Sequence, residues 1–465
     1  GLLARALFSG LAAATIVSHP FQLDESEGMI VAETMLLDRG VGIYGNPTPD
    51  LFISTPYPPL FYLLNLPFQN IAGDAPTFKA GRTLSIASTL MIGLALFGIV
   101  LRITKDRLAG AIAATTWWSL GLITFWGSLV KPDMMAVALG VAGLWVLISR
   151  PPQQVWLALP LFVAAFYTKQ TAIAAVAATI AWLLLTRRVR TALAFGASYA
   201  ALVIIPTLLI NSLTDGGYFY HLLTIHDLPW FGERYLMHVG NLLSQYGLVF
   251  VPGTVALLAG ALLWLRSRLR RELSAQHNAL LLAALYLGAS IVTASGAGTL
   301  GGNHNHLLDW SAASCLGLGL GIGLLRQSGH TLGLQLAGVI AIAILAQLPM
   351  LWTTPSWLKL EYGQLSAEKL NGMSNIAQYV TNDPGEAYSD NVGLMLSAGK
   401  KLWTTDPYTQ THATLYGRWD ERKLVEAIQA KKFSQIVLRI DTTQRQDSAG
   451  DVSPAILQAV QDSYK

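Results

Sequence analysis

The chain has 465 residues, of which 52% are hydrophobic and only 12% are charged, and its mean hydropathy is +0.44. Soluble proteins carry about 25% charged residues, so this composition excludes a soluble globular enzyme, a disordered chain and a fibrous protein. It predicts a polytopic helical membrane protein. The single cysteine, Cys315, lies in an apolar run, so a disulfide framework and a cysteine-based metal site are excluded as well.

About eleven apolar segments approach the roughly 20 residues that a helix needs to cross a hydrocarbon core of about 30 Å. They are residues 1–19, 80–101, 108–124, 133–149, 154–168, 170–186, 191–212, 247–265, 277–294, 307–325 and 332–352. The alternation typical of β-barrel strands is absent, and helices satisfy their own backbone in lipid. We therefore expect an all-α transmembrane domain over residues 1–352.

The basic residues between these segments are unevenly distributed. If the N-terminus is cytoplasmic, the inner side carries thirteen basic and two acidic residues, whereas the outer side up to residue 352 carries six basic and twelve acidic ones. An excess of Lys and Arg is the usual mark of the cytoplasmic side. The net charge of +4 is thus a topology signal, and we expect no nucleic-acid partner. The inner basic residues are Arg5, Arg102, Lys105, Arg107, Arg150, Arg187, Arg188, Arg190, Arg266, Arg268, Arg270, Arg271 and Arg326.

Three outer segments, residues 20–79, 213–246 and 295–306, are too long for simple hairpins. Long loops without structure of their own are usually functional. The first of them contains an apolar pattern that predicts a short amphipathic helix ending at Gly40. An odd number of spans places the tail, residues 353–465, outside. Its alternating helix and strand patterns predict a small extracytoplasmic α/β accessory domain.

Ionisable residues at the membrane edge gather on the outer face, and such residues are functional candidates by default. Asp24, Glu25 and Glu27 follow directly after the first span. Paired carboxylates suit general-base catalysis or cation binding, whereas the alternative is a solvated loop in which Asp24 caps the next helix. Because Asp24 adjoins the apolar span, we favour a functional role.

Four other residues lie at the same edge. Tyr57, in a proline-rich run, either lines a polar cavity or belongs to an aromatic belt at the interface. Lys131 and Asp133 flank Pro132 and either hold a phosphate and orient a partner, or simply mark a helix start. Lys169 is the only charge between residues 151 and 186, and it either snorkels to the interface or binds a phosphate.

The run 301–309, with the sequence GGNHNHLLD, is the last candidate segment. Its glycines permit close approach, and its Asn and His side chains supply hydrogen bonds. His304 and His306 could bind a metal, but no third ligand is near them, so we favour sugar or phosphate binding over zinc. Weaker candidates, which are more often structural, are Arg82, His221, His226 and Arg234.

The order and sidedness of these motifs resemble the GT-C class of membrane glycosyltransferases, which includes the protein O-mannosyltransferases of family 39 and the aminoarabinose transferase that modifies lipid A. The resemblance covers about residues 1–350. The first span followed by Asp24 and Glu25 is similar to the acidic motif of the first outer loop, and residues 33–44 are similar to its amphipathic helix. Tyr57–Leu60 is similar to the family's aromatic-Pro-Pro entry, and Arg82 is similar to the Arg at the start of its second span. Lys131–Asp133 resembles its basic-x-Asp motif, and Asn303–Asp309 resembles its Asn-rich motif.

The resemblance implies inverting transfer of a hexosyl or pentosyl group from a polyprenyl-phosphate donor to a hydroxyl of a glycan, lipid or protein. It places the reaction on the outer face of the membrane, which we expect to be the periplasmic side of a bacterial inner membrane. Asp24 is the expected catalytic base. The expected substrate-binding residues are Glu25, Tyr57, Arg82, Lys131, Asp133, Lys169, Asn303, His304 and His306.

A phosphate leaving group needs cations near it rather than a general acid. The aminoarabinose transferase has a Glu-Lys pair where this chain has Pro56 and Tyr57, so Lys131, Lys169 or a histidine is expected to bind the phosphate here. We predict no dedicated metal site, although Mg²⁺ or Mn²⁺ held by Glu25 and Asp133 is left open.

Two other functions remain as alternatives: a transporter or flippase of lipid-linked sugars, and a polymerase or ligase of surface polysaccharide. Transporters tend to place ionisable groups near the midplane and to show internal repeats. Here no repeat is visible and the polar residues gather at one edge, which favours the enzyme.

Overall fold

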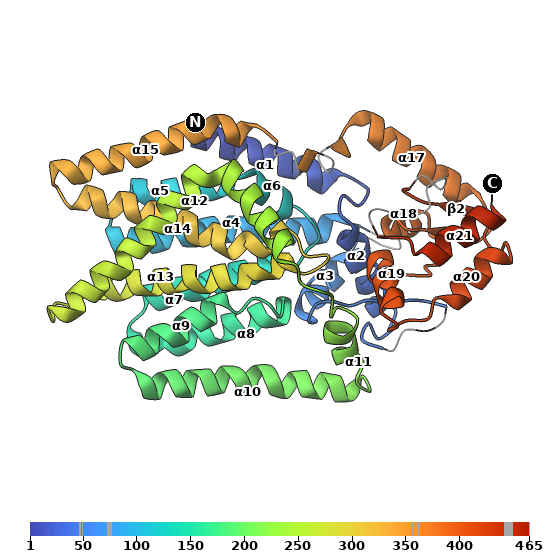
Figure 1. Ribbon diagram of the computed structural model, residues 1–465, viewed down its shortest axis with the longest axis horizontal. Helices are drawn as coiled ribbons and strands as arrows, with labels where there is room; N and C mark the ends of the chain where they lie inside the picture. The colour runs from blue at the N-terminus through green and yellow to red at the C-terminus, as the bar shows by residue number, and fades with distance from the viewer. Residues whose placement is uncertain are drawn as a thin grey trace.

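The computed structural model describes residues 1–45, 48, 50–71, 77–354, 358–359, 363–440 and 450–464. Its long helices lie side by side along the longest axis of the molecule, and the tail forms a smaller part at one end of them (Figure 1). The predicted architecture, a bundle of apolar helices with a small C-terminal part containing helices and strands, is confirmed.

Each predicted span coincides with a helix or with two consecutive helices. Six described helices are long and apolar enough to cross a membrane, two of them lengthened by the 3₁₀ turns next to α13 and α14, whereas α1, α7 and α9 are apolar but shorter. The helices of the bundle are α1 (Leu2–Ser18), α4 (Lys79–Thr104), α5 (Arg107–Ser119), α6 (Gly121–Trp126), α7 (Asp133–Ser149), η1 (Pro152–Ala158), α8 (Leu159–Thr168), α9 (Ala174–Leu185), α10 (Val189–Leu213), α12 (Gly232–Leu269), α13 (Ala275–Thr293), α14 (Leu308–Gln327) and α15 (Thr331–Trp352).

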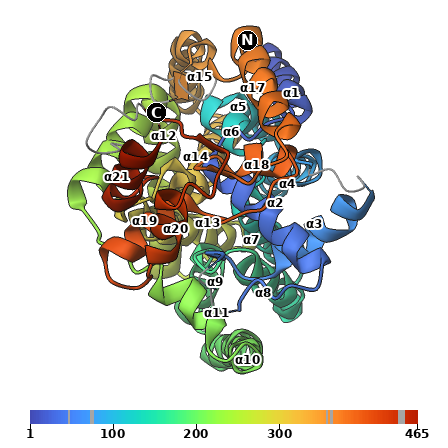
Figure 2. The same cartoon turned by 90° about the vertical axis from the view of Figure 1, so that its right-hand side faces the viewer.

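Helix α14 is the centre of the bundle and packs against α12, α5, α4, α13 and α15, whereas α10 and α15 lie at the periphery (Figures 1 and 2). Glycines allow this close packing. A Cβ on Gly253 would lie 2.1 Å from the carbonyl oxygen of Ser314, and a Cβ on Gly317 would lie 2.1 Å from that of Gly253. Small residues at helix contacts are the usual way in which membrane helices approach one another.

The segments predicted to be outer gather at one end of the bundle, next to the tail (Figure 1). Asp24 caps α2 through the backbone N–H of Ser26, and the predicted end of this helix is marked by Gly40, whose φ is +75°. Helix α2 lies between α3 and the tail, so its residues 27–34 are buried. The short elements here are α2 (Glu25–Asp38), α3 (Leu60–Ile71), α11 (Gly217–Phe219), the π-helix η2 (Tyr220–Thr224), η3 (Ala294–Gly298) and η4 (His304–Leu307).

The tail contains two short parallel strands, in which Ala387, Tyr388 and Ser389 lie opposite Gln435, Ile436 and Val437. The helix and strand patterns predicted for the tail are thus present, although each strand is only three residues long. The elements are α17 (Ala367–Asn382), β1 (Ala387–Ser389), α18 (Val392–Ser397), α19 (Pro407–Leu415), α20 (Arg422–Gln429), β2 (Gln435–Val437) and α21 (Pro454–Ser463). That this part is a separate domain starting at residue 353 stays a prediction.

Backbone hydrogen bonds join the tail to the first outer segment. The N–H of Phe52 donates to the carbonyl of Trp403 at 3.0 Å, and the N–H of Thr405 donates to the carbonyl of Phe52 at 2.9 Å. The Phe52 ring also packs edge-on against Trp419, with ring centroids 5.1 Å apart. The tail is therefore docked on the same end of the bundle as the predicted site residues.

Candidate active site

Two lysine–aspartate pairs lie next to each other at this end of the bundle. Nζ of Lys131 lies 2.8 Å from Oδ1 of Asp24, and Lys169 pairs with Oδ1 of Asp133. Lys131 and Asp133 are separated only by Pro132, so the two pairs form one row of alternating charge. Asp24 retains 21% of its side-chain exposure, whereas the other three side chains are below 10%.

Local structure favours each position in this row. Asp24 and Asp133 lie at the N-termini of α2 and α7, where the helix dipole stabilises a carboxylate. Lys169 lies directly after α8, where the same effect stabilises a cation. The ammonium of Lys131 also lies 4.3 Å from the centre of the Trp126 ring, which adds a cation–π contact.

The run 301–309 meets the row through Asn305 and His306. The Asn305 side-chain amide donates to Oδ1 of Asp133 at 2.8 Å. Asn305, His306 and Asp309 line a small cavity with Asp133 and Lys169. The Tyr286 hydroxyl donates to the Asp309 carboxylate at 2.6 Å. This cavity of about 20 Å³ holds about one water molecule, so there is little free space beside Asp133 and Lys169.

Two other predicted residues of the same run lie differently. Asn303 is exposed and caps η4, accepting from the N–H of His304 at 2.7 Å. The His304 ring packs edge-on against His238, with centroids 4.5 Å apart. Asn305 therefore takes the place that we predicted for Asn303. The two asparagines are two residues apart in one motif, and only the turn of η4 decides which one faces Asp133.

Arg82, predicted to bind substrate, is fully buried in a protein-only network. Its guanidinium makes two hydrogen bonds of 2.8 Å to the Glu27 carboxylate and three more to the carbonyls of Ile16, His19 and Phe21. All five guanidinium N–H groups are thus used. Glu27 also accepts from the N–H of Leu23 and of Val130. This network holds α1, α2 and α4 together next to the row, which favours a structural role for Arg82.

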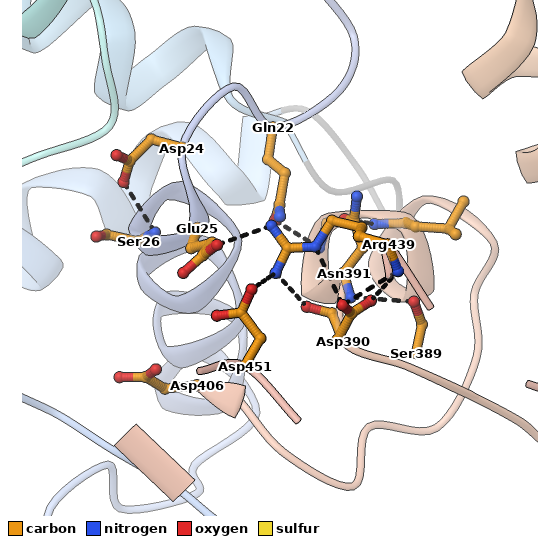
Figure 3. A network of polar contacts seen from close by, with 12 residues as sticks. Gln22, Asp24, Glu25, Ser26, Ser389, Asp390, Asn391, Asp406, Arg439 and Asp451 are labelled. Atoms are coloured by element: carbon orange, nitrogen blue, oxygen red, sulfur yellow. Dashed lines mark hydrogen bonds and ion pairs between the residues drawn. The ribbon is translucent and has the colours of Figure 1, made fainter. Parts of the chain in front are cut away.

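Glu25, also predicted to bind substrate, points away from the row. Figure 3 shows Glu25 turned toward Arg439 of the tail and Asp24 turned in the other direction. Nη1 of Arg439 donates to Oε1 of Glu25 at 2.8 Å. The structure thus places Glu25 at the contact between the first outer segment and the tail.

Tyr57 lies near the two aspartates of the row. It is partly buried, and its pKa is raised well above the usual value by burial and then by the charges of Asp133 and Asp24. The carbonyl of Pro56 accepts from the Gln170 side chain at 2.8 Å, which ties this segment to the Lys169 turn. The Tyr57 hydroxyl is therefore available as a neutral hydrogen-bond group near both carboxylates.

The weaker candidates hold loops in place. The His221 ring bonds to the carbonyl of Gly45 at 2.7 Å, and the His226 ring bonds to the Ser54 hydroxyl at 3.0 Å. Burial lowers the pKa of His226 to about 3, so this ring is neutral at physiological pH. Arg234 donates to the carbonyl of Gly302 at 3.3 Å.

A second group of buried polar residues was missed by sequence reasoning. Glu33, Ser54, Thr405 and Asp406 meet where α2 and the first outer segment contact the tail. A glutamate on an otherwise apolar helix face was the only signal in the sequence. Metal binding finds no support in the arrangement of acidic, histidine and cysteine side chains: within the described ranges, no three of them come together as a ligand set.

Comparison with solved structures places the chain among known membrane folds. The ArnT of Cupriavidus metallidurans bound to undecaprenyl phosphate matches with a TM-score of 0.61 at 11% identity, over 92% of this chain and 90% of that one. Its apo state gives a TM-score of 0.59 over the same shares. The apo oligosaccharyltransferase of Archaeoglobus fulgidus matches with a TM-score of 0.50 at 12% identity, over 88% of this chain and 65% of that one. These similarities show the fold alone.

A search of curated proteins finds no match. The family model of glycosyltransferase family 87, in contrast, matches residues 55–295, which is more than half of the chain. The matched region contains Tyr57, Lys131, Asp133 and Lys169, although the match assigns no role to any of them. The predicted GT-C resemblance is confirmed, and a transferase is supported over a transporter. The chain is an integral membrane protein that belongs to glycosyltransferase family 87.

Proposed function

We propose that this glycosyltransferase transfers a sugar from a polyprenyl-phosphate donor to an acceptor hydroxyl, with inversion at the anomeric carbon. The observation that carries the proposal is the row formed by Asp24, Lys131, Asp133 and Lys169 at one end of the bundle. A carboxylate suits proton abstraction, and two ammonium groups suit a phosphate leaving group. The ArnT structure with undecaprenyl phosphate supports this donor class, because the two chains share a fold.

In the proposed reaction, the acceptor oxygen attacks the anomeric carbon while the bond from that carbon to the phosphate oxygen breaks. The new glycosidic bond forms on the opposite face of the sugar. The acceptor proton passes to the carboxylate of Asp24, and the electron pair of the broken bond stays on the polyprenyl phosphate. Lys131 and Lys169 stabilise the charge on this leaving group, and Asn305, His306 and Tyr57 are placed to bind polar groups of the donor.

The ion pairs give donor binding a direct effect on the base. In the conformation described here, each lysine is paired with an aspartate and the cavity beside Lys169 is small. A phosphate that binds to Lys131 competes with Asp24 for the same ammonium. Donor binding is thus expected to release the Asp24 carboxylate, so that it can accept the proton of the acceptor. Donor binding would then precede proton transfer from the acceptor.

The distribution of charge supports an active site on the outer face. The loops joining α4 to α5, α9 to α10, α12 to α13 and α14 to α15 lie at the end of the bundle opposite the row (Figure 1). These loops carry most of the Lys and Arg residues that mark the cytoplasmic side. We propose that the row and the tail face the periplasm of a bacterial inner membrane, with the donor lipid chain in the bilayer.

The test uses purified full-length protein with a panel of polyprenyl-phosphate sugars and simple acceptor alcohols. Asp24→Asn keeps the cap of α2 but removes the base, so we expect sugar transfer to fall by a factor of about 10² or more. Binding of the consumed donor should be as tight as in the unmodified protein or tighter, because both lysines remain and Lys131 no longer pairs with a charged Asp24.

Asp38→Asn is the matched control, since Asp38 is an exposed carboxylate at the other end of α2. It should transfer sugar at the normal rate. Normal transfer by Asp24→Asn would show that Asp24 is not the base, and a complete panel with no consumed donor would contradict the donor class.

A further inference from the structure

The segment that carries Asp24 is held by the tail on both sides of this residue. The side-chain oxygen of Gln22 accepts from the backbone N–H of Gly393 at 2.8 Å. The carboxylate of Glu25 accepts from Arg439 at 2.8 Å. Gly393 is the second residue of α18 and Arg439 lies two residues after β2, so two parts of the tail contact residues 22–25, which we call the Asp24 segment.

Arg439 is fixed within the tail before it reaches Glu25. Nη2 donates to Oδ2 of Asp451 at 2.9 Å and to the carbonyl of Asp390 at 3.2 Å, and Nε lies 3.3 Å from Oδ2 of Asp390 (Figure 3). Both aspartates are buried: Asp390 is 1% exposed and Asp451 is 4% exposed. Asp390 follows β1 and Arg439 follows β2, and the carboxyl ends of two parallel strands lie at the same edge. A guanidinium oriented in this way loses little conformational freedom on binding Glu25.

Close backbone packing makes the contact stiff. A Cβ on Gly28 of α2 would lie 2.1 Å from the side-chain oxygen of Gln22 and 2.8 Å from the backbone nitrogen of Gly393. Helices α2 and α18 therefore meet with no room for a side chain between them. A shift of the tail at this point would move the start of α2, and with it Asp24.

The ion pair between Glu25 and Arg439 contributes little to the free energy of folding. Glu25 retains 41% of its side-chain exposure and Arg439 retains 35%. Exposed ion pairs contribute roughly 0–1 kcal/mol to folding. Loss of this one contact should leave the fold intact, so an effect on catalysis can be separated from an effect on folding.

We propose that Arg439 is a positioning residue of the transferase: by holding Glu25 it fixes the Asp24 carboxylate relative to Lys131 and the donor. The inference rests on the proposed role of Asp24 as base. It assigns a part in catalysis to the tail, whereas the sequence analysis predicted only that the tail is an accessory domain. It also explains why Glu25 is acidic although it points away from the lysines.

The test compares Arg439→Gln, Glu25→Gln and the double variant in the full-length protein, with kcat and KM measured for the consumed polyprenyl-phosphate donor. We expect each single variant to lower kcat by about tenfold, because misplacement of a reacting group by about 1 Å can reduce a rate up to about a hundredfold. The KM for the donor should stay within about twofold, since the lysines are untouched. The double variant should be no slower than either single one, because both remove the same contact.

Two further variants separate positioning from general damage. Arg439→Lys keeps the charge and should recover part of the lost kcat. Arg422→Gln removes an exposed arginine of the tail that pairs with Asp420 and does not contact α2, so it should behave as the unmodified protein. The melting temperature of Glu25→Gln should change by less than about 2 °C.

Several results would overturn the inference. Unchanged kcat in both single variants, or effects of Arg439→Gln and Glu25→Gln that multiply in the double variant, would show that Arg439 does not act through Glu25. If Arg439→Gln does not fold, Glu25→Gln alone decides the question. Loss of transfer in Asp24→Asn together with normal Glu25→Gln contradicts only the positioning role, whereas normal transfer in Asp24→Asn contradicts the proposed base.

Discussion

Arg82 and Glu27 form the most deeply buried ion pair among the described residues, with no side-chain exposure on either partner. Their carboxylate and guanidinium are satisfied entirely by each other and by backbone groups from the end of α1, the start of α2 and the turn before α7. A buried pair with all its hydrogen bonds made is stable only while both partners are present. At the residue scale, this pair fixes the ends of three helices around Asp24.

We predict that Arg82→Gln lowers the free energy of unfolding by about 3–5 kcal/mol, because it leaves the Glu27 carboxylate buried without its cation. Denaturant unfolding in detergent measures the change. Lys79→Gln, an exposed position on the same helix, is the control and should be within about 0.5 kcal/mol of the unmodified protein. Equal stability of the two variants would show that the pair does not support the fold.

Helix α14 shows at the element scale why its sequence alternates glycine with larger apolar residues. Gly317 and Gly321 face α12, where a Cβ would come 2.1 Å from the carbonyl of Gly253 and 2.9 Å from Cβ of Ala256. Gly319 and Gly323 face the other side, where a Cβ would meet Ala113 at 2.8 Å and Thr104 at 2.7 Å. Two stripes, each made of glycines four residues apart, thus let neighbouring helices approach on both faces of α14.

Gly317→Ala should destabilise the bundle by about 1–3 kcal/mol, because the added methyl group overlaps backbone atoms of α12 that have no room to move. Thermal unfolding in detergent detects this as a lower melting temperature. The matched variant is Gly288→Ala on α13, where nothing lies within 4 Å of the added Cβ. That variant should be as stable as the unmodified protein or more stable, since Ala favours a helix. A melting temperature for Gly317→Ala equal to that of Gly288→Ala would contradict the packing argument.

Helix α2 meets the tail through the buried carboxyl of Glu33. Oε1 of Glu33 accepts from the Thr405 hydroxyl at 3.3 Å, and burial raises its pKa well above the usual value, with the nearby Asp406 acting in the same direction. When the pKa of an acid is higher in the folded state, the folded protein keeps the proton at pH values between the two pKa values, where the unfolded chain has already lost it. Its contribution to stability is thus complete at acid pH and decreases as the pH rises from the ordinary carboxyl range to the raised pKa.

The stability of the unmodified protein should decrease from acid to alkaline pH. We expect this decrease to be smaller in Glu33→Gln, because the variant has no carboxyl group at this position to ionise. Near pH 5 the variant and the unmodified protein should melt at similar temperatures, whereas at pH 9 the variant should melt higher. Melting curves at several pH values measure this, with the exposed Glu368→Gln of the tail as control. Parallel pH profiles for Glu33→Gln and the unmodified protein would show that Glu33 is not a buried neutral acid.

At the scale of the whole molecule, the basic loops and the candidate site lie at opposite ends of the bundle. The basic loops lie at one end, and the Asp24 row, the first outer segment and the tail lie at the other (Figure 1). The row and Asn305, which contacts it, come from the starts of α2 and α7, the end of α8 and η4, so four parts of the chain must be in place before the site exists. The bundle thus acts as a rigid frame for a site built at its edge.

Cysteine labelling tests the proposed orientation. In intact cells, a membrane-impermeant maleimide should label Gln429→Cys in the tail, whereas Ser328→Cys in the loop before α15 should react only after the cells are permeabilised. Both parent residues are exposed, and the natural Cys315 is fully buried, so it should add little background. The reverse pattern would place the row and the tail in the cytoplasm.

Features that depend on neighbours along the chain were determined by the sequence itself. Apolar runs predicted the helices, the basic residues predicted which loops share one end of the bundle, and the short spacing of Lys131 and Asp133 predicted a charged cluster at the start of α7. The choice of partners was decided only by the tertiary structure, because it joins residues far apart: Lys169 and Asp133 are 36 positions apart, and Glu25 and Arg439 are 414 apart. Hydrophobic periodicity reports burial, which is local. Which buried charge meets which opposite charge depends on how helices pack, and that is why Asn305 rather than Asn303 joined the site, while Arg82 and Glu25 turned to other partners.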